Sequence, residues 1–182
     1  PGTNVDEFQE YVKTATTVPE PIMKPVGEGK NPNTMYRFGM MLKRNASIDK
    51  KKMIEAARYF KGAADGGVAE AAYEYAMQAA KGIGIPQDLS DANTYFKIAA
   101  DKGNIVDAMY EFAEMAKNGD GMEKADEKLA CQYYKKAGLS GNAEAMHKAS
   151  LLESKFLQEQ TQTQPQKTHQ KRKNDSQFRY TP

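Results

Sequence analysis

The strongest constraint on the fold of this chain is an internal repeat with a period close to 37 residues. Its clearest markers stand in register along the sequence: Tyr36, Tyr73, Tyr110 and His147. A second block, an aromatic pair followed by lysine, begins at Tyr59, Tyr95 and Tyr133. A period of about 20–50 residues is typical of stacked supersecondary units, each of which buries its apolar face only against its neighbours. Two blocks per period predict two helices per unit.

Residues 71–81 show best how the first helix of a unit is patterned. Small and aromatic residues recur there on one side of a helix: Ala71, Ala72, Tyr75, Ala76 and Ala79. This side is the predicted core. Gly82 and Pro86 end the helix, because glycine accepts the left-handed cap and proline cannot continue the hydrogen bonding. The second helix is expected to begin near Asp88 or Ser90, since both are good N-cap residues.

The units resemble the Sel1-like repeat, a relative of the tetratricopeptide repeat with a longer turn between its helices. The second unit carries the resemblance through Ala71, Tyr75, Ala76, Gly82, Gly84, Ile85, Asp88, Ala92, Tyr95, Ala99, Ala100 and Gly103. The first unit departs from the pattern at 45–49, where the two-glycine turn is missing. The resemblance implies an all-α, right-handed superhelical solenoid of antiparallel helix pairs over residues 33–157, with about three repeats and a terminal capping helix. It also implies an adaptor or scaffold rather than a catalyst.

The two ends of the chain do not follow the repeat. Residues 1–32 are interpreted as an extension or linker, with a short helix predicted at 5–14 before a stretch broken by proline and glycine. Residues 158–182 are rich in Gln, Thr and Lys, a composition that cannot offset the entropy of ordering, so a disordered basic tail is predicted. Within it Lys171, Arg172 and Lys173 resemble a minimal nuclear-import cluster, although a solvated tail without that role is the favoured interpretation.

Composition narrows the class of protein. The formal net charge is +2, and the tail from Gln158 holds five basic and two acidic residues, so the repeat region is close to neutral. This balance argues against nucleic-acid binding by the folded part. A single cysteine excludes an internal disulfide framework and favours a reducing compartment, so we expect an intracellular, chiefly cytoplasmic protein. No apolar run approaches the roughly 20 residues that span a bilayer, so no membrane association is expected.

Candidates for chemistry are few. Cys131 follows a small residue on a predicted second helix and is interpreted as a buried spacer. His147 replaces the repeated tyrosine, and His169 lies in the predicted tail. No cysteines or histidines have metal-ligand spacing. The glycine pairs at 82–84 and 119–121 follow no strand and continue into no nucleotide-binding pattern. The sequence therefore predicts no enzyme, no catalytic residue, no metal site and no cofactor.

A second stripe on the first helices is the candidate binding surface. At about 100° per residue, residues one helical turn apart line up roughly opposite the core. We name this surface the tyrosine stripe, and its members are Tyr36, Met40, Lys43, Tyr73, Met77, Tyr110, Glu114, Lys117 and His147. Such first helices line the concave side of superhelical arrays. Two interpretations stay open: a groove that binds a partner, or aromatic packing between neighbouring helices.

The functional hypothesis that follows is a protein-interaction module that binds a peptide or partner domain in this groove. The alternative is a passive spacer or regulatory appendage of a larger multidomain protein, with an enzyme such as a kinase outside the sequence. The sequence does not identify the partner or the oligomeric state.

Overall fold

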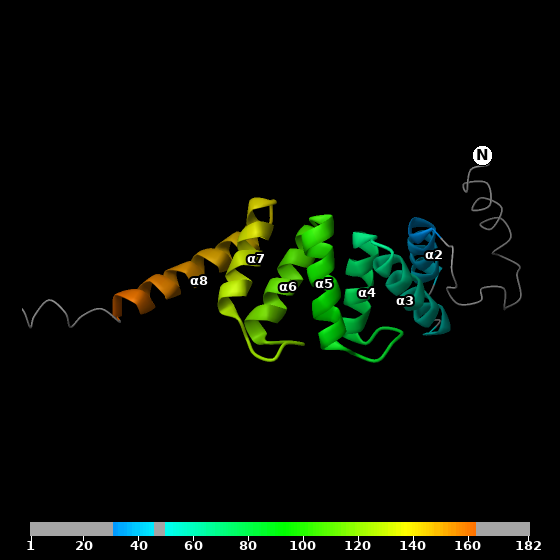
Figure 1. Cartoon of the computed structure of the whole chain (residues 1–182), viewed down its shortest axis with the longest axis horizontal. Helices are drawn as coiled ribbons and strands as arrows, with labels where there is room; N and C mark the ends of the chain where they lie inside the picture. Colours follow the sequence, from blue (N-terminus) through cyan, green and yellow to red (C-terminus); the bar gives the residue numbers. More distant parts are fainter. Residues whose placement is uncertain (1–30, 46–49, 163–182) are drawn as a thin grey trace, which may run out of the picture. The chain divides into compact units, whose positions relative to one another are not determined.

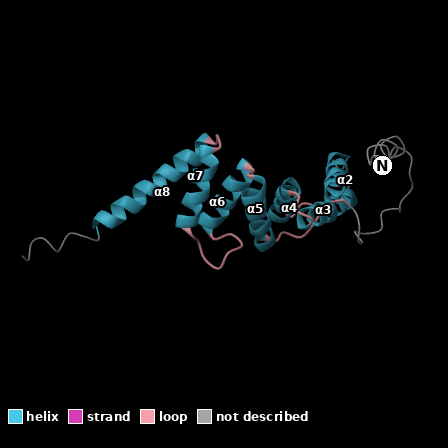
Figure 2. Ribbon diagram, turned by 45° about the horizontal axis from the view of Figure 1, so that its top comes forward, coloured by secondary structure: helices cyan, strands magenta, loops and turns pink. Residues whose placement is uncertain are grey.

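The computed structural model describes residues 31–45 and 50–162, and within these ranges the chain is helical, with no strand (Figures 1 and 2). The helices are α2 Pro32–Asn45, α3 Lys50–Asp65, α4 Ala69–Lys81, α5 Leu89–Gly103, α6 Val106–Asn118, α7 Glu127–Leu139 and α8 Ala143–Gln162. The all-α prediction is confirmed for this part of the chain. The predicted helix at 5–14, residues 46–49 of the altered turn at 45–49 and the tail from 163 onward lie outside the described residues. Asn45 is the last residue of α2, and α8 continues beyond position 157.

Each helix packs chiefly against the helices that precede and follow it in the chain. The first helices α2, α4 and α6 pair with the second helices α3, α5 and α7, and α8 packs on α7 (Figure 1). The contacts concentrate between neighbouring elements, as expected of a solenoid built from repeated units. The predicted stacking of helix pairs is therefore present in the structure.

Alanine forms much of the contact surface between the helices. The five residues predicted as the core side of α4 are all buried, including Ala71, Ala76 and Ala79, which have no exposed surface. Ala99 and Ala137 are equally buried on second helices. Small side chains let helix backbones approach closely, and larger rings then fill the remaining space. The largest fully buried side chains are Phe60, Phe96, Phe112 and Tyr134.

The ends of the helices follow the predicted capping chemistry. Asp88 caps α5 by accepting a hydrogen bond from the backbone N–H of Asp91, and Asp126 caps α7 in the same way. Gly82 and Gly119 end α4 and α6 in the left-handed conformation, with φ of 67° and 82°. The sequence left Asp88 and Ser90 open as the cap of α5, and the structure selects Asp88.

The second glycine of each turn has a role that the sequence did not reveal. Gly121 has a φ of +68°, and a Cβ there would lie 2.0 Å from the carbonyl oxygen of Leu89. At Gly84 a Cβ would lie 2.7 Å from the backbone of Met53. These glycines therefore do more than end a helix, because they let the turn of one unit press against the start of the preceding second helix.

Candidate functional site

The three tyrosines of the stripe occupy equivalent places in successive units, and each is half-buried. In each unit the tyrosine ring packs against a buried aromatic ring of the following second helix. The ring centroids are 6.1 Å apart for Tyr36 and Phe60, 5.9 Å for Tyr73 and Phe96, and 5.8 Å for Tyr110 and Tyr134. The tyrosines therefore combine features of the two open interpretations, since one side of each ring packs on the core while part of the side chain reaches the surface.

The hydroxyl groups of these tyrosines differ. Tyr110 donates to Glu144 at 2.6 Å, and its oxygen accepts from the ammonium of Lys148 at 2.5 Å. Neither Tyr36 nor Tyr73 has a hydrogen-bond partner among the described residues. The first two rings of the stripe thus present a polar tip that the described chain leaves unused.

Carboxylate charges act on the hydroxyl groups of both tyrosines. Burial raises the pKa of the Tyr73 hydroxyl, and the nearby charges of Asp107, Glu111 and Glu74 raise it further. The pKa of Tyr36 is raised by burial and, in addition, by the charge of Glu74. Carboxylates are therefore the nearby charges that raise the pKa of both hydroxyls.

The remaining members of the stripe range from exposed to ion-paired. Met40 is among the exposed large hydrophobic residues, at 37%, and Met77 is half-buried. Lys117 and His147 are exposed. Lys43 forms an ion pair of 2.5 Å with Glu74 on α4, so its ammonium already has a partner within the chain.

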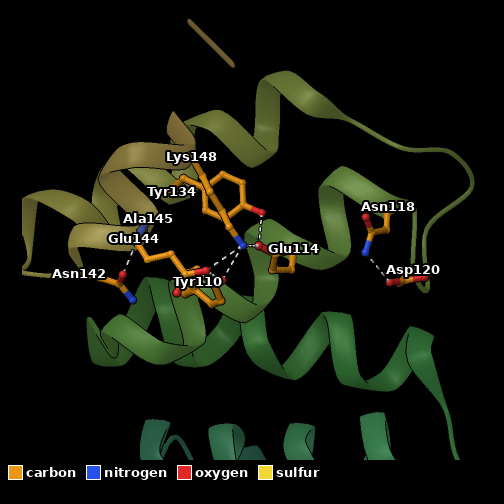
Figure 3. A network of polar contacts seen from close by, with 9 residues as sticks. All are labelled: Tyr110, Glu114, Asn118, Asp120, Tyr134, Asn142, Glu144, Ala145 and Lys148. Carbon is orange, nitrogen blue, oxygen red and sulfur yellow. Dashed lines mark hydrogen bonds and ion pairs between the residues drawn. The ribbon is translucent and has the colours of Figure 1, made fainter. Parts of the chain in front are cut away.

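Glu114 belongs to a polar network that joins α6, α7 and α8 (Figure 3). Its carboxylate accepts from Lys148 and, at 2.5 Å, from the hydroxyl of Tyr134. The Lys148 ammonium also lies 4.6 Å from the ring centroid of Tyr110 and 3.2 Å from a carboxylate oxygen of Glu144. An ammonium between aromatic rings and carboxylates gains cation–π and charge-assisted hydrogen bonds together. The network fastens α8 to the last helix pair.

The charges of this network stabilise one another. Burial alone would lower the pKa of Lys148, but the hydrogen bonds that its ammonium donates to Glu114, Tyr110 and Glu144 outweigh that effect and raise it. Burial would raise the pKa of Glu114, yet its bonds with Lys148 and Tyr134 hold the value below its usual range.

The predicted stripe contained Glu114 and missed Lys148. The signal was in the sequence, because Lys148 stands in register with Glu111 and Glu74 at the repeat period.

A second set of tyrosines lies on another side of the helices and is buried: Tyr75, Tyr95 and Tyr133. We call these the buried tyrosines. Each hydroxyl donates to an aspartate: Tyr75 to Asp91 at 2.7 Å, Tyr95 to Asp65 at 2.6 Å, and Tyr133 to Asp101 at 2.7 Å. In the last two cases the aspartate is on the preceding second helix, so the bond links one unit to the next.

Candidates for other chemistry have the following places. Cys131 is buried, its thiol lies 3.7 Å from the carbonyl oxygen of Ala149, and burial raises its pKa. The interpretation as a buried spacer agrees with this environment. Among the residues that the structure describes, no group of three His, Cys, Asp or Glu side chains could hold a metal ion. In the same part of the chain, no helix has the length and apolar character that a bilayer crossing requires.

Comparison with known proteins also identifies Sel1 repeats in this chain. The sequence model of the Sel1 repeat matches residues 69–104 and 106–142. A search of curated protein sequences finds no significant match. Among solved structures, the chain is similar to a Sel1 repeat protein from Oxalobacter formigenes, with a TM-score of 0.62 and 24% identity over 81% of this chain and 57% of that one. It is also similar to c5321, a protective antigen of uropathogenic Escherichia coli with an SLR fold, with a TM-score of 0.62 and 19% identity over 84% of this chain and 30% of that one.

These likenesses concern the fold, and the chain spans little more than half of the first neighbour's length and less than a third of the second's. The two matched segments coincide with the helix pairs α4–α5 and α6–α7. The repeat pattern, the helix pairs and the matched segments agree, and residues 69–104 and 106–142 are Sel1 repeats.

Proposed function

We propose that this protein is an interaction module that binds a peptide or partner domain through the tyrosine stripe, on the concave side of the solenoid. The observation that carries the proposal is the pair Tyr36 and Tyr73. The two side chains lie one repeat apart, both are half-buried, and both hydroxyls lack a hydrogen-bond partner among the described residues. A large ring with an unused polar tip is the residue type that protein interfaces favour.

Packing prepares these rings for binding. Because Tyr73 rests on Phe96 and Tyr36 on Phe60, each ring is held in one orientation before a partner arrives. A preorganised side chain loses less conformational entropy on association, so more of its contact energy appears as affinity. Met40 and Met77 stand beside the two tyrosines and can adapt their shape to a partner.

A photocrosslinking experiment tests this proposal. In the full chain, Tyr73 is replaced by the photoreactive p-benzoylphenylalanine, and in a matched control the same group replaces the exposed Gln132 on a second helix. The expected result is a defined protein adduct from position 73 that is absent from position 132. Excess unlabelled chain should suppress the adduct, whereas excess chain carrying Tyr36→Ala and Tyr73→Ala should not.

Equal adducts from both positions, or equal competition by both unlabelled chains, would contradict binding at the stripe. That outcome would favour the alternative role as a spacer or appendage, for which the stripe has no partner to bind.

A further inference from the structure

Successive first helices repeat one arrangement across the gap between them. Carboxylates near the start of each first helix act on the tyrosine of the previous one: Glu70 and Glu74 on Tyr36, and Asp107 and Glu111 on Tyr73. We call these places the first and middle intervals. The last interval, between α6 and α8, holds Tyr110 with Glu144 and Glu114.

Lysines of the chain itself occupy the first and last intervals. In the first, the ammonium of Lys43 pairs with Glu74 at 2.5 Å. In the last, Lys148 pairs with Glu114 and Glu144 and lies over the ring of Tyr110. The two lysines come from different helices and different positions, yet both bring a cation to the carboxylates beside a stripe tyrosine.

In the middle interval, no lysine among the described residues forms an ion pair with Asp107 or Glu111. One period after Lys43 the chain has Ala80, and one period before Lys148 it has Glu111. Glu111 is half-buried and has neither an ion pair nor a hydrogen bond from its side chain to any described residue. Burial and the charges of Glu114 and Asp107 raise the pKa of Glu111, and the charges of Lys81 and Lys148 offset this only in part. Desolvating a carboxylate without a partner is costly, and a cation placed there would remove that cost.

We infer that the middle interval, formed by Tyr73, Asp107 and Glu111, receives a lysine or arginine side chain from a basic segment of the partner protein. This inference rests on the proposed function and specifies its chemistry. The last interval provides the precedent within this molecule, since an ammonium there contacts a tyrosine ring and two carboxylates together. Charge decides between possible occupants, because acidic or phosphorylated segments would be repelled by the same carboxylates.

A random 12-residue peptide display library, selected on the full chain, tests this inference. The enriched peptides are synthesised, and their affinities are measured by calorimetry. We expect them to share one lysine or arginine whose replacement by glutamine weakens binding by at least about tenfold, the range of a lost charge pair in a partly desolvated site. Glu111→Gln should weaken the same peptides to a similar degree.

A second pair of variants tests whether a lysine of the chain itself can take the place of the peptide's cation in the middle interval. Ala80→Lys introduces a lysine in register with Lys43. Its ammonium should form an ion pair with Glu111, so peptide affinity should fall by at least about tenfold. Ala80→Gln is the matched control, with a side chain of similar length and no charge, and should change the affinity by less than about twofold. Equal effects of the two variants would show steric exclusion and overturn the inference.

The outcomes separate this inference from the proposed function. Peptides that need Tyr73 but keep their affinity on Glu111→Gln would leave the stripe as a binding surface and refute the cationic contact. Peptides indifferent to both changes would refute the proposed function itself. The chain truncated after Gln162 serves as a second target: if peptides bind only after truncation, the occupant is the basic tail of this chain and not a partner.

Discussion

The buried tyrosines and the tyrosines of the stripe are the same residue type in one array of helices, but their hydroxyl groups are used differently. Tyr95 and Tyr133 each donate to an aspartate of the preceding second helix, at 2.6 and 2.7 Å. The hydroxyl groups of Tyr36 and Tyr73 have no hydrogen-bond partner among the described residues, although the rings of both also pack on buried aromatic rings. Hydroxyl pairing therefore distinguishes Tyr95 and Tyr133, which join neighbouring units, from Tyr36 and Tyr73, which we propose face a partner.

Truncation of the rings should separate the two sets most strongly. Tyr133 is 5% exposed, so Tyr133→Ala should destabilise the protein by about 3–5 kcal/mol, as large-to-small substitutions in packed interiors do. Tyr73→Ala removes a half-buried ring and should cost no more than about 2 kcal/mol. Urea unfolding of both variants gives the comparison. Equal losses would break the distinction between the two sets.

Removal of the hydroxyl alone should give a smaller difference in the same direction. Tyr95→Phe loses the bond to Asp65, and because that carboxylate is exposed and returns to water, we expect a loss of about 1 kcal/mol. Tyr73→Phe breaks no bond within the described residues and should change stability by less than about 0.5 kcal/mol. Thermal unfolding at one protein concentration resolves the two values. A loss of about 1 kcal/mol for Tyr73→Phe would reveal an internal partner and remove the tip from the proposed interface.

Gln78 tests whether the lack of a hydrogen-bond partner is enough to identify a residue that binds another protein. It is 3% exposed, and neither its side-chain nitrogen nor its oxygen has a hydrogen-bond partner among the described residues, yet it is too deeply buried to contact another protein. The register positions in the other units carry Met41 and Met115. Gln78→Met should therefore stabilise the protein by about 1 kcal/mol, because a buried polar group without bonds is replaced by an apolar one of similar size.

The reciprocal change, Met115→Gln, is the matched control and should destabilise by a similar amount. Partner affinity should stay the same in both variants. If Gln78→Met destabilises the protein instead, the amide has a bonding partner in solution, such as a buried water.

The smallest expected effect is the pH dependence of the stability that the network around Lys148 contributes. The pKa of Glu114 is held below its usual range, so its stabilising contribution is present above about pH 4.5 and is lost as the pH falls through the lowered value. The wild-type chain should exceed Glu114→Gln in stability by up to about 1 kcal/mol at pH 7, and this margin should shrink towards pH 3. Glu123→Gln, at an exposed turn position, should show no such change of margin. A margin for Glu114→Gln that is constant between pH 7 and pH 3 would contradict the ion pair.

The sequence predicted the features that depend only on a residue's position along one helix, namely the buried side of the helix and its two ends. The alanine side of α4, the helix end at Gly82 and a cap of α5 at Asp88 or Ser90 follow from local periodicity and backbone chemistry. The structure agrees and selects Asp88. The repeat register also placed Tyr36, Tyr73 and Tyr110 in equivalent positions.

Contacts between helices could not be read in the same way. Lys43 and Glu114 were predicted as parts of an open stripe, but each has a partner on another helix. Long side chains reach across the gap between units, and which of them meet depends on the relative placement of helices that the sequence pattern does not specify. The same limitation concealed Glu111, whose lack of a partner is evident only once its neighbours have been placed.

The most direct test of the account combines stability and affinity in one variant pair, Tyr73→Ala and Tyr95→Ala. For each full-length variant, urea unfolding gives the stability, and calorimetry with the highest-affinity peptide from the display selection gives the affinity at a temperature where both variants remain folded. We predict that Tyr73→Ala loses at least about tenfold in affinity and at most about 2 kcal/mol in stability, whereas Tyr95→Ala loses about 3–5 kcal/mol in stability with affinity within about twofold. The opposite assignment, with affinity lost at Tyr95 and kept at Tyr73, would contradict the claim that the tyrosine stripe is the binding surface.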